Sequence, residues 1–156
     1  MFCILPDYPT NANSLIALIE KRIREKQIVV LHDYKKEDGS VETWQSFIKN
    51  QFRSFIKDTG CIEWSETTGK YQYGLVQRPW RFISQQSSGA TYLHAHRLIW
   101  SAINQVNLVD LNPFVVRHLC GNHSCCQPAH LAIGTYYENT RDRKLHDLSI
   151  PLAPAI

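Results

Sequence analysis

The chain has 156 residues, of which 44% are hydrophobic and 20% charged, and its formal net charge at pH 7 is +3. This length and composition favour a single domain with a packed core, and so small a positive charge is only weak support for a polyanionic partner. No run approaches the ~20 apolar residues of a membrane span, and the first residues lack the pattern of a secretion signal. We therefore expect a cytoplasmic protein without a membrane partner, in which cysteines stay reduced.

The first 60 residues predict mostly helix. Residues 12–26 place apolar side chains at helical spacing opposite a basic face. A short β-like run at 28–34 and an Asp-Gly turn follow. Residues 41–58 predict a second helix, because an aromatic and aliphatic stripe runs along them and ends just before Gly60.

After Gly60 the pattern changes to strands. Residues 61–77 predict a β-hairpin around the sequence Thr-Thr-Gly-Lys, and residues 78–94 are typical of irregular strand and loop. A helix is predicted at 95–105, where apolar residues return to helical spacing. Short strands at 113–119 and 130–135 then flank a polar loop.

The last predicted helix has a recognisable start. Thr135 and Glu138 have the spacing of a capping box, in which a hydroxyl and a carboxylate satisfy the first backbone amides of a helix. We therefore expect a helix from about residue 136 to residue 146. Together with the two strands, it completes a strand–loop–strand–helix unit.

The loop of this unit is rich in metal ligands. Residues 118 to 131, HLCGNHSCCQPAHL, hold three histidines and three of the five cysteines. Cys120, Cys125 and His130 stand five residues apart, and a compact loop brings three such side chains together. Zinc prefers thiolate and imidazole ligands in a tetrahedral set of four. Metal binding explains these cysteines better than a disulfide framework does.

The fourth ligand has two candidates. Cys61 opens the preceding hairpin and is the better one, and His123 competes for the same place. Cys126 is expected to point the other way if Cys125 points inward, because neighbours in extended chain alternate sides. Without metal, these would be buried cysteines and surface histidines on a polar loop with little apolar content to order it. Structural zinc supplies on the order of 10 kcal/mol of binding energy.

His118 lies two residues before the first loop ligand, on the same side of the predicted strand as Cys120. It is either a ligand, a structural histidine or a general base. A strand anchored by zinc would hold its imidazole rigidly, and neutral imidazole is an effective base near pH 7.

The segment HLCGNHSCCQPAHLAIGTYYENTRDR resembles the ββα-metal nuclease motif of the HNH and His-Cys box endonucleases. The shorter segments CIEW, YGL and AHRLIW are similar to segments that occur in this order in small phage HNH proteins, so that the resemblance covers about residues 61 to 143. One departure is Gln127, where many relatives carry asparagine. Since this position lies outside the ligand set, we expect the departure to matter little.

The resemblance implies a role for each residue of the motif. His118 would be the general base that deprotonates water, and Asn139 would hold one catalytic Mg2+ through its amide oxygen. The structural zinc would be bound by Cys61, Cys120, Cys125 and His130. An arginine of this family grips the scissile phosphate, and Arg78, Arg81 and Arg97 are candidates. We favour Arg81, because it follows the hairpin that begins with Cys61. His96 is either an orienting residue or an ordinary core histidine.

The expected fold is therefore α+β. It has a zinc-stapled ββα-metal (His-Me finger) nuclease core at 61–147, which begins with the antiparallel hairpin and follows the N-terminal helices. Residues 1–60 would be a helical segment that contacts DNA or forms a dimer surface, and residues 148–156 a C-terminal tail. A single ββα site cuts one strand, so cutting both strands calls for a homodimer. The helix at 41–58 and the apolar tail are the candidate interfaces.

The implied function is a sequence-specific, Mg2+-dependent endonuclease of double-stranded DNA, of homing or restriction type and encoded by a bacterium or phage. The alternatives are a zinc-stabilised, non-catalytic DNA-binding protein and a nonspecific nuclease. Base edges in the major groove are read by arginine and glutamine, so a β-ribbon between 71 and 94, including Gln85, Gln86 and Ser87, is expected to read the target. The candidate DNA contacts are Gln72, Gln77, Arg78, Arg81, Arg97, Arg141 and Arg143.

Overall fold

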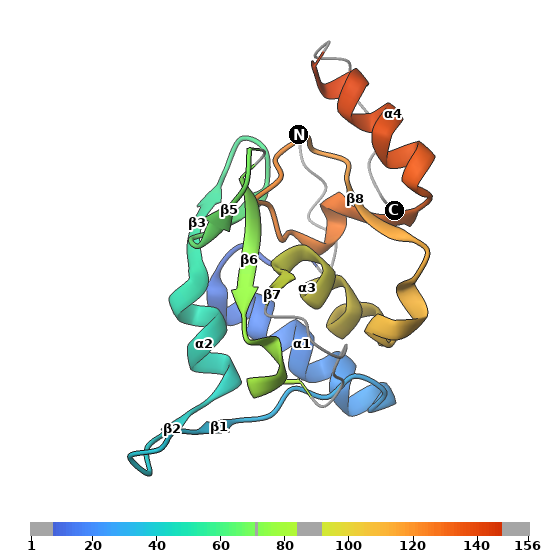
Figure 1. Cartoon of the computed structure of the whole chain (residues 1–156). Coiled ribbons are helices and arrows are strands. Elements are labelled where there is room, and N and C mark those ends of the chain that lie inside the picture. The colour runs from blue at the N-terminus through green and yellow to red at the C-terminus, as the bar shows by residue number, and fades with distance from the viewer. Residues whose placement is uncertain (1–7, 71, 84–91, 148–156) are drawn as a thin grey trace.

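A computed structural model describes residues 8–70, 72–83 and 92–147 (Figure 1). The predicted contacts at Gln85, Gln86 and Ser87 and the predicted tail at 148–156 lie outside the described residues. The helices are α1 (Ala12–Lys26), α2 (Trp44–Gln51), α3 (Ala95–Asn104) and α4 (Tyr136–Asp147). The strands are β1 (Tyr34–Lys35), β2 (Val41–Glu42), β3 (Phe52–Ile56), β4 (Cys61–Trp64), β5 (Thr67–Thr68), β6 (Tyr73–Gln77), β7 (Tyr92–His94), β8 (Val115–His118) and β9 (Leu131–Gly134).

The described elements form a mixed α+β fold with small antiparallel sheets, as predicted. The pairs β1–β2, β3–β4 and β8–β9 are two-stranded, and β5–β6–β7 form a three-stranded sheet. Helix α1 packs against both α2 and α3, whereas α4 stands at the edge of the molecule (Figure 1). Within the described residues, no helix combines the length and the apolar character needed to cross a membrane.

Helix α1 has the predicted bounds. Asn11 caps its start, because Ser14 N–H donates to Asn11 Oδ1 at 2.8 Å and Asn11 N–H donates to Ser14 Oγ at 3.1 Å. Its apolar face packs against α2 and α3. The main core draws on both halves of the chain, and its buried members include Leu15, Ile19, Ile48, Ile62, Trp64, Val76, Leu98 and Ile99.

Two predictions in the first 60 residues were wrong. The run at 28–34 is not a strand: Leu31 makes an isolated bridge to Ile83, and regular pairing starts only at β1. The predicted helix at 41–58 ends at Gln51, and its second half is β3, which pairs with β4. The apolar spacing at 52, 55 and 56 fits a helix or a strand, and backbone pairing with β4 decides between them.

The strand–loop–strand–helix unit forms as predicted. Strands β8 and β9 pair from Val115 opposite Gly134 to His118 opposite Leu131. The capping box is present: Glu138 N–H donates to Thr135 Oγ1 at 3.1 Å, and Thr135 N–H donates to Glu138 Oε1 at 3.1 Å. The 12-residue loop between the strands therefore begins at the end of β8 and ends at the start of β9, which lies beside it.

Candidate metal centre and nuclease site

Four predicted ligands converge at one end of the β3–β4 hairpin. The donor atoms of Cys61, Cys120, Cys125 and His130 all lie within 4.8 Å of one another. His130 Nδ1 is 3.6 Å from the Cys61 sulfur and 3.5 Å from the Cys125 sulfur. A tetrahedral ion with bonds of about 2.3 Å to sulfur and about 2.0–2.1 Å to nitrogen would separate these atoms by about 3.6 Å. The donor set and its spacing therefore fit zinc.

The charges of the three thiols need a cation. Hydrogen bonds from Cys120, and then from Cys125, hold the pKa of Cys61 well below its ordinary value. Burial, followed by contact with the other two sulfurs, raises the pKa of Cys125 well above its ordinary value. One thiolate thus forms readily and opposes the ionisation of its neighbours. A bound metal ion removes this conflict, because thiolate is the metal-binding form of cysteine.

The segment before α1 supports the metal centre. Sequence reasoning predicted the centre but not this support. The Tyr8 hydroxyl lies 3.2 Å from Nε2 of His130, so it holds the imidazole by the nitrogen that faces away from the sulfurs. Gly60 provides the space: a Cβ at this position would overlap the Tyr8 hydroxyl. A contact across 122 positions leaves no local pattern in the sequence.

Gln127, where many relatives carry asparagine, lies outside the donor set as expected, and it has a structural role. Its side chain is fully buried, and its amide nitrogen donates to the carbonyl oxygens of Pro9 at 2.8 Å and Gly60 at 3.0 Å. The amide therefore ties the ligand loop both to the N-terminal segment and to the turn that precedes Cys61. Each bond satisfies a buried backbone carbonyl.

The other two residues considered as ligands lie elsewhere. Cys126 is buried in the main core, opposite to Cys125 as predicted, and its N–H donates to Ile62 O at 2.8 Å. His123 does not belong to the donor cluster. Its ring stacks on Tyr73 at a centroid distance of 4.8 Å.

His118 ends β8 and is only 4% exposed. Its Nε2 lies 3.1 Å from the Cys125 carbonyl oxygen, so we assign the ring proton to this nitrogen. Burial, and then the charge of His123, lowers the pKa of His118 to about 3. The imidazole is therefore neutral at pH 7, with Nδ1 as its proton acceptor.

Further histidines gather around Tyr73, the first residue of β6. The His94 ring stacks on the Tyr73 ring at a centroid distance of 5.0 Å, and the His118 ring centroid lies 5.9 Å from that of Tyr73. His96 is buried and lies 4.2 Å from His118 between ring centroids. Burial lowers the pKa of His96 well below its ordinary value. Sequence reasoning did not find Tyr73, because the histidines around it come from the β7–α3 junction, β8 and the ligand loop.

An ion-pair clamp attaches α4 to β8. Arg117 Nε donates to Asp142 Oδ2 at 2.6 Å and Nη2 donates to Oδ1 at 2.9 Å, while Nη1 lies 3.3 Å from Glu138 Oε2. Asp142 is the buried residue of α4, and it is 1% exposed. Asn139 follows Glu138 and lies one turn before Asp142, so the clamp fixes the part of α4 that carries it. Its side-chain amide makes no hydrogen bond within the described part of the chain.

The structure separates Arg81 from His118 and brings Arg97 closer. β6 begins at Tyr73, beside His118, and its five residues span about 13 Å before the turn that carries Arg81. β7 then pairs antiparallel with β6 and returns the chain to the His118 end, where α3 starts. Burial, and then the charge of Arg97, lowers the pKa of His94. Arg97 thus lies on the histidine side, and its Nη1 donates to Phe114 O at 3.4 Å.

The remaining predicted DNA contacts are dispersed. Gln72 and Gln77 are exposed at the two ends of the β6 region, where Gln72 accepts from Thr67 Oγ1 at 2.8 Å and Gln77 donates to Glu66 Oε1 at 2.8 Å. Arg141 is exposed and Arg143 half-buried on α4. Their contacts with DNA remain predictions.

This site defines a class of protein. Residues 60–147 match the model of a family described as the zinc-binding loop region of homing endonuclease. Because the match spans more than half of the chain, the chain belongs to this family, as the resemblance predicted. The family and the cluster of three cysteines and one histidine together support a structural zinc.

Among curated proteins, the chain is similar to Protein 2.8 of Escherichia phage T7. The two are 31% identical over 87 residues, which are 56% of this chain and 51% of that protein. The chain thus spans about half the length of this relative. No solved structure matches the chain.

Proposed function

We propose that the chain is a Mg2+-dependent endonuclease that hydrolyses double-stranded DNA at specific sequences. The observation that carries this proposal is that β8 positions both proposed catalytic residues. His118 ends this strand and is oriented by the Cys125 carbonyl, while Arg117 of the same strand holds the turn of α4 that carries Asn139. Two groups that suit phosphodiester hydrolysis are thereby attached to the same short strand. Membership of an endonuclease family makes DNA the expected substrate.

In this proposal His118 is the general base. With Nε2 occupied by the Cys125 carbonyl, Nδ1 accepts a proton from the attacking water. The lowered pKa keeps the ring unprotonated throughout the neutral range, but it also makes His118 a weaker base than an ordinary imidazole, because a general base works best with a pKa near the operating pH. Zinc bound by Cys61, Cys120, Cys125 and His130 has a structural role, because a set of four protein ligands leaves no open position.

Asn139 is proposed as the protein ligand of the catalytic cation. Its amide oxygen is free of hydrogen bonds within the described residues, and Mg2+ takes few protein oxygens in addition to water and phosphate. When bound, Mg2+ would neutralise charge on the phosphoryl group and help the leaving oxygen. For the phosphate contact we now propose Arg97 in place of Arg81, because Arg97 lies on the histidine side of the molecule.

Cutting both strands at a specific site requires two active sites, so we propose a homodimer of a phage or bacterial homing or restriction enzyme. Sedimentation of the protein alone and on DNA tests the assembly. A monomer in both states would contradict it.

Plasmid cleavage tests the activity. Purified, zinc-loaded protein is incubated with several plasmids with and without Mg2+, and the fragment ends are sequenced; discrete, recurring ends are expected only with Mg2+. His118→Ala and Asn139→Ala should each abolish cutting while zinc content and DNA binding persist. Asn50→Ala, an exposed asparagine on α2, is the matched control and should cut normally. Normal cutting by His118→Ala would refute the mechanism.

The burial of His118 favours one alternative, a zinc-stabilised DNA-binding protein without catalysis. A 4% exposed imidazole bonded to a carbonyl is also what a structural histidine looks like. This alternative predicts that DNA is bound but not cut with any divalent cation. Degradation without recurring ends would instead indicate a nonspecific nuclease.

A further inference from the structure

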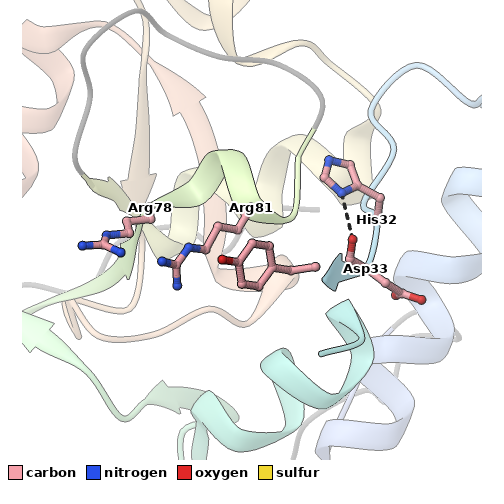
Figure 2. Close-up of a pocket in the computed structure, with 5 residues that line it drawn as sticks. His32, Asp33, Arg78 and Arg81 are labelled. Carbon is pink, nitrogen blue, oxygen red and sulfur yellow. Dashed lines mark hydrogen bonds between the residues drawn. The ribbon is translucent and has the colours of Figure 1, made fainter. Parts of the chain in front are cut away.

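A pocket of about 500 Å3 lies at the other end of β6 from His118. It is lined by His32, Asp33, Tyr34, Arg78 and Arg81 (Figure 2). The two walls are joined by backbone contacts: His32 N–H donates to Phe82 O at 2.8 Å, and Leu31 pairs with Ile83. The pocket is therefore part of the fold, built from the segment before β1 and the turn after β6.

The arginines of this pocket have no acidic partner among the residues that the structure describes. Arg22, Arg53 and Arg117 pair with glutamate or aspartate, whereas no carboxylate within the described residues forms an ion pair with Arg78 or Arg81. In Figure 2 both guanidinium groups point the same way and the Asp33 carboxylate is directed away from them. That carboxylate accepts from Trp44 N–H at 3.3 Å, at the start of α2.

One of the two side chains is held in place by an aromatic ring. The Arg81 guanidinium lies 4.7 Å from the centre of the Tyr34 ring, a cation–π contact that orients its plane. Arg78 has a φ of 49°, in the left-handed region that costs free energy for a residue other than glycine. Two guanidinium groups at one pocket, with no ion-paired carboxylate among the described residues, suit a phosphate group, which accepts several N–H bonds at once.

We propose that this pocket binds a phosphate group, through Arg78 and Arg81, at a site separate from the nuclease site. The inference rests on the proposed function in so far as the phosphate belongs to DNA held at His118. The length of β6, about 13 Å, corresponds to about four base-pair steps of 3.4 Å. A duplex cut at His118 would thus offer a backbone phosphate to the pocket. The phosphates of a free nucleotide have the same chemistry and are the other source.

The test uses the full zinc-loaded chain without divalent cations, so that no DNA is cut. Binding of a fluorescein-labelled duplex is measured by anisotropy at several salt concentrations for the parent and for Arg78→Gln/Arg81→Gln. Loss of the contact with this one phosphate should reduce the slope of log affinity against log salt by about 0.9. Arg53→Gln removes a 64% exposed arginine from β3 and is the matched control, with an unchanged slope. Titration calorimetry with pyrophosphate provides a second arm.

A reduced slope in the double variant alone supports the pocket with DNA as its ligand. An unchanged slope together with pyrophosphate binding that the double variant loses supports it with a free nucleotide. An unchanged slope and no difference in pyrophosphate binding would overturn the proposal. Failure of the nuclease proposal has a different readout, which is the absence of cutting with Mg2+, so the two can fail separately.

Discussion

Replacing Asp142 with asparagine tests the attachment of α4. Asp142 is 1% exposed and is the one buried residue of this helix within the described chain, so α4 has no apolar stripe to hold it against β8. Asp142→Asn keeps the shape but leaves Arg117, whose side chain is 14% exposed, facing a neutral amide. Breaking a buried pair costs about 3–5 kcal/mol. Because Glu138 still lies 3.3 Å from Arg117, we take the lower value, about 3 kcal/mol.

The expected result is local. A loss of about 3 kcal/mol raises the population of detached α4 by about 150-fold, and hydrogen exchange of residues 136–147 should accelerate by about this factor while exchange in α1 is unchanged. Asp147→Asn, an exposed carboxylate on the same helix, is the control and should exchange like the parent. Unchanged exchange of α4 in Asp142→Asn would refute the clamp. Equal acceleration in α1 would show that the effect is global.

Three further substitutions and one control test the metal centre. Cys61→Ser should lose bound zinc and expose the ligand loop to protease, whereas Cys126→Ala, whose sulfur lies in the core, should retain one zinc per chain by metal analysis. Tyr8→Phe removes the hydrogen bond to the His130 imidazole and should lower zinc affinity by about 10-fold in chelator competition, since such supporting contacts are worth about 10–100-fold; an unchanged affinity would contradict this role. Gln127→Ala should lower the free energy of unfolding in urea by about 2 kcal/mol, about 1 kcal/mol for each lost bond, and a change near zero would contradict it.

The metal centre was predictable because its information is local. The spacing of Cys120, Cys125 and His130 and the ligand chemistry of zinc define most of the set. Cys61 was chosen because it opens the predicted hairpin at 61–77. That hairpin is not formed as predicted, because β4, which Cys61 opens, pairs with β3, and β6 pairs with β5 and β7; Cys61 nevertheless joins the donor set. Tyr8 was not predictable, because it reaches His130 across 122 positions without any periodic pattern. The same holds for the rings around Tyr73.

The errors in the fold have a related cause. Apolar residues at 52, 55 and 56 continue a helical stripe, yet they equally suit a strand, and only pairing with β4 resolves the ambiguity. The preference for Arg81 over Arg97 rested on sequence order alone and did not consider the direction of β6 and β7; which arginine contacts the phosphate stays a prediction. Arg81 follows β6 directly and therefore lies at the end of this strand that is far from His118. Because β7 runs antiparallel to β6, the chain then returns toward His118, where Arg97 lies.

The two groups proposed for catalysis depend on different supports. His118 and Arg117 are neighbours on β8 and point to opposite sides, as successive strand residues do. The imidazole is held by the Cys125 carbonyl, hence by the zinc loop, and the helix that carries Asn139 is held by the Arg117 clamp. Removal of zinc should therefore disorder the base together with the loop, whereas Asp142→Asn should displace the amide and leave the base in place. If both perturbations changed the His118 NMR signal in the same way, the zinc loop and the Arg117 clamp would act as one cooperative unit. The conclusion that the loop supports the base and the clamp separately supports the metal ligand would then be refuted.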